Sequence, residues 1–361
     1  MKNKVTINVL TSPFSTPNSS AFIFPLKMNK LQLEESNIHI SYFSKINSQI
    51  TNADIILIDS KFFRNKWDEK NINRTLSEFE YLKKNKSKLV YSDISDSSGV
   101  MHFKMLDHVD YYMKNQIFKN KNYYMDKLYG MRLYSHYFYE SLNVKDQDPI
   151  WSVPLISKVN LKKILLGWNS CFNNYGLFGN YQQFLQKRIQ LDFLLFNPLR
   201  YRSDFDTRKK EVQIRFGSSN YRNSVGFFRK MVGKKLKRFS ANSNKINRIS
   251  YFNELKNTKL ILSPFGFGEI NYKDFEVFIT GGALMKPSMD HMITWPNLYT
   301  KETVVFHDWD FKDIDMKIEY FLDNSKSLKV IAENGQENYF TFLNNKRLFV
   351  DYFLKIVQKI I

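Results

Sequence analysis

Short apolar segments alternate with helical segments along this chain, and that alternation constrains the fold more than any other feature. In the first half the helical stretches lie near residues 21–33 and 75–84. Strands that alternate with helices predict a parallel sheet built from βαβ units. The strand-like segments of this half are 5–10, 38–43, 53–60 and 88–91.

The same pattern restarts at residue 211, after a less regular stretch rich in Tyr and Phe in which we expect a helix over 181–196. A chain of 361 residues fits two ordinary domains. The expected fold is therefore α/β, with two Rossmann-like domains facing a cleft: an N-terminal domain over 1–200, a C-terminal domain over 201–345 and a C-terminal helix over 346–361. The strands expected in the second series are 211–217, 259–262, 283–285 and 304–306, and the helices are 224–236, 251–255 and 271–280.

Composition narrows the class of protein. The hydrophobic fraction is 43% and the charged fraction is 25%, which is typical of a folded globular chain. The single cysteine, Cys171, excludes an intrachain disulfide and a thiolate zinc cluster. Since no apolar run approaches the roughly 20 residues of a membrane span, we expect a cytoplasmic protein.

The net charge of +19 is compatible with nucleic acid, an anionic membrane surface or anionic substrates as partners. One cluster stands out, because six of the ten residues from Arg229 to Arg238 are basic. Two interpretations of this cluster remain open: a solvated helix end, or a surface that faces phosphates or the anionic lipids of the inner membrane face.

A glycine loop carries the strongest functional signal. The segment Ser263 to Glu269, with sequence SPFGFGE, directly follows an apolar strand and precedes a helix. Glycines at such a position can serve a tight strand-to-helix turn that needs positive φ. Alternatively, they let backbone N–H groups approach a ligand closely, and the N-terminus of the following helix favours an anion. Glu269 and Glu276 lie seven residues apart, close to two helical turns, so that both can share one helix face.

The longer run that begins at Ser263 resembles the donor-binding segment of glycosyltransferases with the GT-B architecture, and more narrowly the family 1-like or exostosin-like bacterial enzymes. That run is SPFGFGEINYKDFEVFITGGALMKPSMDHMITWP, within a resemblance that spans about 211–345. The segments 93–99 and 109–114 are similar to uncharacterised bacterial members. The resemblance implies a nucleotide-sugar donor as substrate and two Rossmann-like domains, with the nucleotide-sugar-binding domain over 201–345 and the acceptor-side domain over 1–200.

The resemblance also implies residue roles. Glu276 would hydrogen-bond the ribose hydroxyls, and Glu269 would touch hydroxyls of the donor sugar. Gly266 and Gly268 would cradle the diphosphate or the sugar. The cations expected to neutralise the phosphates are Lys273 or Lys286, together with Arg215. Because retaining members often space their two glutamates one residue further apart, the resemblance assigns no stereochemistry.

An acceptor hydroxyl needs a base when the reaction inverts. Asp93 and Asp96 follow the strand 89–91, at the expected cleft edge of the N-terminal domain, and are the catalytic candidates; ordinary turn and cap chemistry is the competing interpretation. His102 and His108 are the next candidates. The remaining histidines of interest, His291 and His307, belong to the donor side.

No metal or other cofactor is expected. Four Asp-x-Asp pairs occur, and none follows a convincing strand in the right half of the chain. The favoured function is transfer of a sugar to a hydroxyl of a glycan or lipid-linked acceptor in surface polysaccharide synthesis. The alternatives are another nucleotide-dependent transferase and a basic nucleic-acid-binding protein, although the sequence holds no nucleic-acid-binding motif. The Asp-x-Asp pairs begin at Asp146, Asp204, Asp308 and Asp313.

Overall fold

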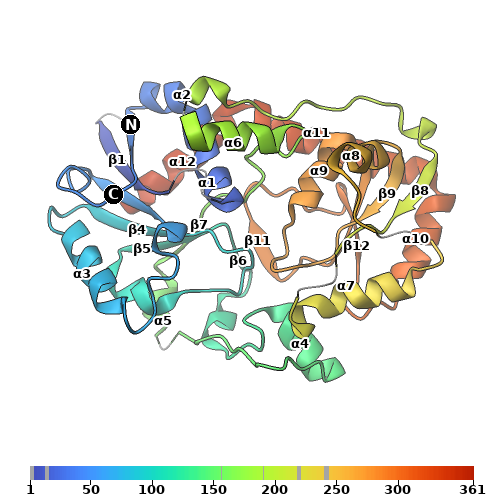
Figure 1. The fold of residues 1–361 in the computed structure, drawn as a ribbon, viewed down its shortest axis with the longest axis horizontal. Coiled ribbons are helices and arrows are strands. Elements are labelled where there is room, and N and C mark those ends of the chain that lie inside the picture. Colours follow the sequence, from blue (N-terminus) through green and yellow to red (C-terminus); the bar gives the residue numbers. More distant parts are fainter. Residues whose placement is uncertain (1–3, 13–15, 156, 190, 218–220, 240–243) are drawn as a thin grey trace.

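The computed structural model describes residues 4–12, 16–155, 157–189, 191–217, 221–239 and 244–361. Two parallel sheets form separate N-terminal and C-terminal domains, which lie side by side in Figure 1. This confirms the expected α/β class with two Rossmann-like units.

The N-terminal domain is built on six parallel strands in the order β2-β1-β3-β4-β5-β7. Its central strand β3 is fully buried, as its run of β-branched and leucine side chains predicts. The strands are β1 (Val5–Leu10), β2 (Ile38–Phe43), β3 (Ile55–Asp59), β4 (Lys88–Asp93), β5 (Tyr111–Lys114) and β7 (Ile164–Leu166). The helices are α1 (Pro17–Met28), α2 (Lys30–Glu35), α3 (Ile72–Leu82), α4 (Leu133–Leu142), α5 (Lys158–Leu161) and α6 (Gly179–Ile189).

The C-terminal domain is built on four parallel strands in the order β12-β10-β9-β8. The strands are β8 (Lys210–Gln213), β9 (Thr258–Leu262), β10 (Ala283–Pro287) and β12 (Val304–His307). The helices are α7 (Asn223–Lys235), α8 (Arg248–Lys256), α9 (Tyr272–Thr280), α10 (Ile314–Asp323) and α11 (Ser325–Asn344).

Two corrections to the expected elements concern the first half. The stretch expected to be less regular contributes two strands to the sheet, β5 and β7, which are only four and three residues long. The helix expected over 181–196 is α6, which ends at Ile189. From residue 191 onward the chain continues in a short 3-10 turn at Asp192–Leu194 and an irregular segment toward β8.

Two features tie the domains together. Strand β6 (Gln116–Phe118) pairs in antiparallel fashion with β11 (Met292–Thr294), so that each domain supplies one strand of a small sheet. The last helix, α12 (Lys346–Ile360), returns to the N-terminal domain, where Phe349 and Phe353 pack edge-on against Trp168. Figure 1 shows α12 beside the first sheet, far from α10.

The carboxyl ends of β4 and β9 point toward the junction of the domains. The loop after β4 meets the loop after β9 there, as the contacts below show. Open parallel sheets bind ligands beyond the carboxyl ends of their strands, and two such ends that face each other define the GT-B architecture.

Candidate active site between the domains

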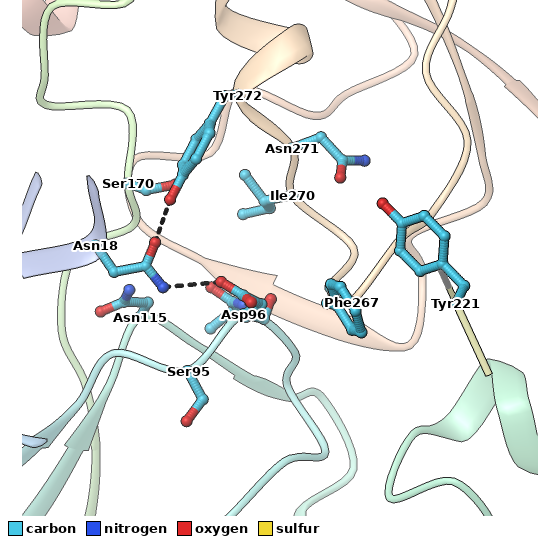
Figure 2. Close-up of a pocket in the computed structure, with 12 residues that line it drawn as sticks. Asn18, Ser95, Asp96, Asn115, Ser170, Tyr221, Phe267, Ile270, Asn271 and Tyr272 are labelled. Carbon is cyan, nitrogen blue, oxygen red and sulfur yellow. Dashed lines mark hydrogen bonds between the residues drawn. The ribbon is translucent and has the colours of Figure 1, made fainter. Parts of the chain in front are cut away.

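A pocket of about 170 Å³ lies where the loops after β4 and β9 meet (Figure 2). The side chain of Asn18, in the first turn of α1, donates to a carboxylate oxygen of Asp96 (2.8 Å) and accepts from the hydroxyl of Tyr272. Hydrogen bonds therefore cross the pocket from one domain to the other. Other lining residues include Ser95, Asn115, Tyr221, Phe267 and Gly268.

Both glycines of the loop after β9 permit a close approach by other protein groups. A Cβ added at Gly268 would lie 1.8 Å from the carbonyl oxygen of Asp96 in the other domain. A Cβ added at Gly266 would lie 2.7 Å from Nη2 of Arg229. The expected contacts of these glycines with diphosphate or sugar remain a prediction. The Asp96 backbone already requires glycine at position 268, whereas at position 266 the close atom is the end of the flexible Arg229 side chain.

Glu269 is fully buried and holds the two domains together. Its Oε1 accepts from the hydroxyls of Ser97 (3.1 Å) and Ser98 (2.7 Å), and its Oε2 accepts from the backbone N–H of Ser98 (3.1 Å). Nε2 of His291 lies 3.3 Å from Oε1. These contacts correct the expectation that Glu269 touches the donor sugar, because the carboxylate is already enclosed by protein donors.

The electrostatics of Glu269 follow from this enclosure. Burial alone would raise the pKa of its carboxyl group, but the facing His291 and the hydrogen bond from Ser98 outweigh burial and lower the pKa to about 2. The carboxylate is therefore charged at neutral pH, inside an interface without solvent.

Asp93 is also fully buried, which corrects its assignment as a catalytic base. It ends β4 opposite Lys114 of β5, whose Nζ lies 3.2 Å from Oδ2. The hydroxyl of Tyr112 and the backbone N–H of Ser95 donate to the same carboxylate. Burial would raise the pKa of Asp93, but the Lys114 ammonium and these bonds hold it well below its usual range. An acceptor hydroxyl cannot reach this group.

Asp96 remains as the acidic side chain that faces the pocket. It is exposed, and Asn18 fixes one of its oxygens. Among the described residues that line the pocket it is the only one with a carboxylate. The two candidates thus differ in their surroundings: Asp93 is enclosed by protein, whereas Asp96 faces the pocket.

Glu276 lies on α9, at the edge of the C-terminal domain that faces α8. Its Oε1 accepts from Nη1 of Arg248 (3.2 Å) and its Oε2 accepts from the hydroxyl of Tyr251 (2.9 Å). Burial raises the pKa of Glu276, although Arg248 and Tyr251 act in the opposite direction. Each oxygen keeps a further lone pair, and the side chain is 11% exposed, in contrast to the fully enclosed Glu269. The expected ribose contact thus remains a prediction.

Cationic groups gather beside Glu276. Nζ of Lys273, one turn earlier on α9, donates to the main-chain oxygen of Arg215 (2.9 Å). Burial and the neighbouring Arg229 guanidinium lower the pKa of Lys273 to about 7, although the Glu276 carboxylate favours the charged form. The guanidinium of Arg215 itself pairs with Glu254 (2.8 Å), so this expected phosphate ligand is already engaged by an acid.

Lys286 is buried and already paired with an acid. It lies on β10, and its Nζ is 2.9 Å from Oδ2 of Asp274, the third residue of α9, whose side chain accepts from the backbone N–H of the N-cap residue Asn271. The Tyr299 hydroxyl donates to the same carboxylate oxygen (3.0 Å). This pair anchors the first turn of α9 to the sheet, and it corrects the expected role of Lys286.

Sequence reasoning missed three groups that the structure brings to the donor side. Arg229 on α7 donates to the carbonyls of Phe265 and Gly217, both at 2.9 Å, and so joins the loops after β8 and β9. Arg248 and Tyr251 hold Glu276. The only signal for Arg229 was its place in the basic cluster, and no spacing in the sequence connects α8 with α9.

The histidine candidates lie outside the described lining of the pocket. His102 is exposed and His108 is partly buried. His307 is buried, its Nδ1 lies 2.9 Å from the carbonyl of Asp308, and burial lowers its pKa to about 4. His291 belongs to the Glu269 contact.

Within the described ranges, no group of three or more His, Cys, Asp or Glu side chains is arranged to hold a metal ion. Asp146 of the first Asp-x-Asp pair is buried and accepts from the backbone N–H of Ser224 (2.8 Å). None of the helices in the described part of the chain combines the length and apolar character needed to cross a membrane.

The fold and this pocket define a two-domain protein of the GT-B architecture. Solved structures with a similar arrangement include HepE from Anabaena in complex with UDP-glucose (TM-score 0.42, 9% identity, 98% of this chain and 100% of that chain). They also include a glycosyltransferase from Rickettsia africae (0.45, 10%, 100% and 99%) and an alpha-glucosyltransferase in complex with UDP-glucose and DNA containing an abasic site (0.40, 10%, 98% and 99%). Comparison with protein-family models and with curated proteins found no match.

Proposed function

We propose that this protein is a glycosyltransferase that moves a sugar from a nucleotide-activated donor to a hydroxyl of a glycan or lipid-linked acceptor. The observation that carries the proposal is Glu276, held by Arg248 and Tyr251 beside the Lys273 ammonium and one turn from the start of α9. A carboxylate next to a cation and a helix N-terminus suits a ribose followed by a diphosphate.

The chemistry breaks the bond from the anomeric carbon to the donor phosphate oxygen and forms a bond to the acceptor oxygen. The nucleoside diphosphate leaves with the bonding electron pair and gains negative charge. On this proposal, Lys273 and Arg229 are the cations that would stabilise that charge in the transition state.

Asp96 is the proposed base for the acceptor hydroxyl. It is exposed in the pocket, on the N-terminal side, and the Asn18 amide orients one of its oxygens so that the other can accept a proton. The acceptor would then enter from the N-terminal domain and the donor from the C-terminal domain.

The proposal places the reaction in surface polysaccharide synthesis, without a metal ion and without a nucleic-acid partner. On this account the excess of basic residues serves anionic substrates and, as argued below, a lipid surface.

A panel of nucleotide sugars, with glycan and lipid-linked hydroxyl acceptors, tests the proposal. We expect at least one donor to release its nucleoside diphosphate faster with an acceptor than without, and to do so in excess chelator. If no donor in the panel binds or turns over, the proposal fails; turnover that depends on added Mn²⁺ or Mg²⁺ would refute only the metal-free part.

A further inference from the structure

Helix α6 turns its apolar side chains to solvent. Tyr181, Phe184, Leu185 and Ile189 are all exposed, whereas the residues of α6 that are buried are Gly179, Gln182 and Gln186. An ordinary surface helix has the opposite arrangement, with its apolar stripe against the core. Figure 1 shows α6 at the rim of the molecule, near α1 and α2.

The two buried glutamines fix this orientation. Nε2 of Gln182 donates to the carbonyl oxygens of Leu194 (2.7 Å) and Phe196 (3.2 Å), and Nε2 of Gln186 donates to the carbonyl oxygen of Leu191. The polar side of α6 is therefore bonded to the backbone of the segment that follows it, and the apolar side is left outward.

The segment after α6 extends the exposed apolar surface. Phe193 is 79% exposed and Leu199 is 85% exposed, although Leu195 between them packs against Phe24 of α1. A neighbouring groove of about 340 Å³ is lined mainly by apolar side chains, among them Phe178 and Leu199. We call the exposed apolar residues of this region the α6 face: Phe178, Tyr181, Phe184, Leu185, Ile189, Leu191, Phe193, Phe196 and Leu199.

Single exposed apolar residues are ordinary on a protein surface, but a continuous set of this kind marks an interaction site. The basic residues beside it indicate which partner fits. Residues 178–202 contain four basic residues and one acidic residue, a formal charge of 4 − 1 = +3. The acidic residue, Asp192, is paired with Lys27 (2.6 Å). Lys187 and Arg188 are exposed in the last turn of α6, and the Arg188 guanidinium lies 4.4 Å from the centre of the Phe184 ring.

We propose that the α6 face docks this protein on a membrane surface that contains anionic lipids. Its apolar side chains would enter the boundary between headgroups and acyl chains, and Lys187 and Arg188 would contact lipid phosphates. Docking is independent of the transfer reaction, so that either proposal can fail alone. Ser170 lines the interdomain pocket and Phe178 belongs to the α6 face, so a short stretch of chain connects the two regions.

The basic cluster of α7 is less suited to this task. Arg229 is bound to two loop carbonyls, and Lys235 and Arg238 both pair with Asp315. Three of the six basic residues in the cluster are thus engaged within their own domain, whereas the apolar residues that a membrane contact also needs lie at α6.

Co-sedimentation with vesicles tests the proposal. The full chain is mixed with vesicles of equal parts phosphatidylcholine and phosphatidylglycerol, and with vesicles of phosphatidylcholine alone. We expect binding to the anionic vesicles that weakens with added salt, and weaker binding to the neutral ones. The Phe184→Ser/Leu185→Ser variant should lose roughly tenfold or more in partition coefficient. The Lys187→Glu/Arg188→Glu variant should lose binding to the anionic vesicles selectively.

The matched control is Met316→Ser/Val330→Ser, because both side chains are exposed outside the α6 face. It should bind as the unaltered chain does, and thermal unfolding should show that all variants are folded. The proposal is overturned if the unaltered chain does not bind anionic vesicles, or if Phe184→Ser/Leu185→Ser binds equally well. It is also overturned if the chain ignores vesicles and forms a dimer that this variant abolishes, since the α6 face would then join two copies.

Discussion

Ser98 of the N-terminal domain donates two hydrogen bonds to Glu269 of the C-terminal domain, one from its backbone N–H (3.1 Å) and one from its hydroxyl (2.7 Å). The two residues lie in the loops that follow β4 and β9. A contact between these loops fixes the separation of the two sheets, and so it fixes the width of the pocket between them.

Replacing Glu269 by Ala should destabilise the closed arrangement. The substitution leaves the donors of Ser97 and Ser98 buried without an acceptor, which costs about 1–3 kcal/mol for each unsatisfied group. We expect a lower melting temperature and a larger radius of gyration by small-angle scattering. Glu333→Ala, at an exposed position on α11, is the control. An unchanged radius and melting temperature would show that Glu269 does not hold the domains.

The same contact predicts that the stability contributed by Glu269 depends on pH. The pKa of Glu269 is lowered to about 2 in the folded chain, below its ordinary value of 4.5. The contribution of its lowered pKa to the free energy of unfolding is therefore complete above pH 4.5 and is lost as the pH falls toward 2. The difference in melting temperature between the unaltered chain and Glu269→Gln should shrink over that range. A difference that stays constant on acidification contradicts this.

Gly268→Ala tests the close approach of the loops. The added methyl group would lie 1.8 Å from the Asp96 carbonyl oxygen, so one loop has to move. Overpacking of this kind costs typically about 1–3 kcal/mol. Gly233→Ala is the matched control, because an added Cβ there meets nothing within 4 Å in α7 and should stabilise by about 0.5–1 kcal/mol. Equal stability of the two variants would refute the account of the loop.

Asp96→Asn and Asp93→Asn should behave differently. If Asp96 is the base, its substitution lowers kcat by about 10²- to 10⁴-fold with little change in donor affinity. Asp93→Asn instead leaves the buried Lys114 without its counter-charge, and breaking such a pair costs about 3–5 kcal/mol of stability. Turnover assays and thermal unfolding of both variants separate the two effects. Full turnover by Asp96→Asn would exclude it as the base.

Lys273 predicts a pH dependence of nucleotide binding. Its pKa is lowered to about 7 without ligand, and a bound diphosphate would favour the charged form and raise that pKa. Affinity should thus be greatest below pH 7 and fall by up to about tenfold per unit above it. Calorimetry in buffers of different ionisation enthalpy would show proton uptake on binding, which Lys273→Met should abolish. A flat profile in the unaltered chain contradicts the assignment.

The α/β class followed from the sequence because buried parallel strands leave long apolar runs such as 53–60. Strands β5 and β7 were missed because four or three residues carry too little pattern. The glycine loop could be seen in the sequence, but the groups that approach its glycines, on Asp96 and Arg229, are distant in sequence and only the fold brings them close. The sequence also could not assign Glu269, because a glutamate buried between two domains and a glutamate that binds a sugar occur in the same sequence pattern.

The donor site rests on Glu276, and nucleotide binding measures it most directly. Thermal shift and calorimetry with nucleoside diphosphates are compared for the unaltered chain, Glu276→Gln, Glu276→Ala and the control Glu333→Ala. Saturation at a hundred times the dissociation constant should stabilise the unaltered chain by about 2.7 kcal/mol. The account predicts that the two Glu276 variants stay folded and lose about 10- to 100-fold in affinity, as expected for loss of a charged hydrogen-bond partner, while Glu333→Ala binds normally. Equal affinity in all four proteins, or no binding of any nucleoside diphosphate to the unaltered chain, would contradict it.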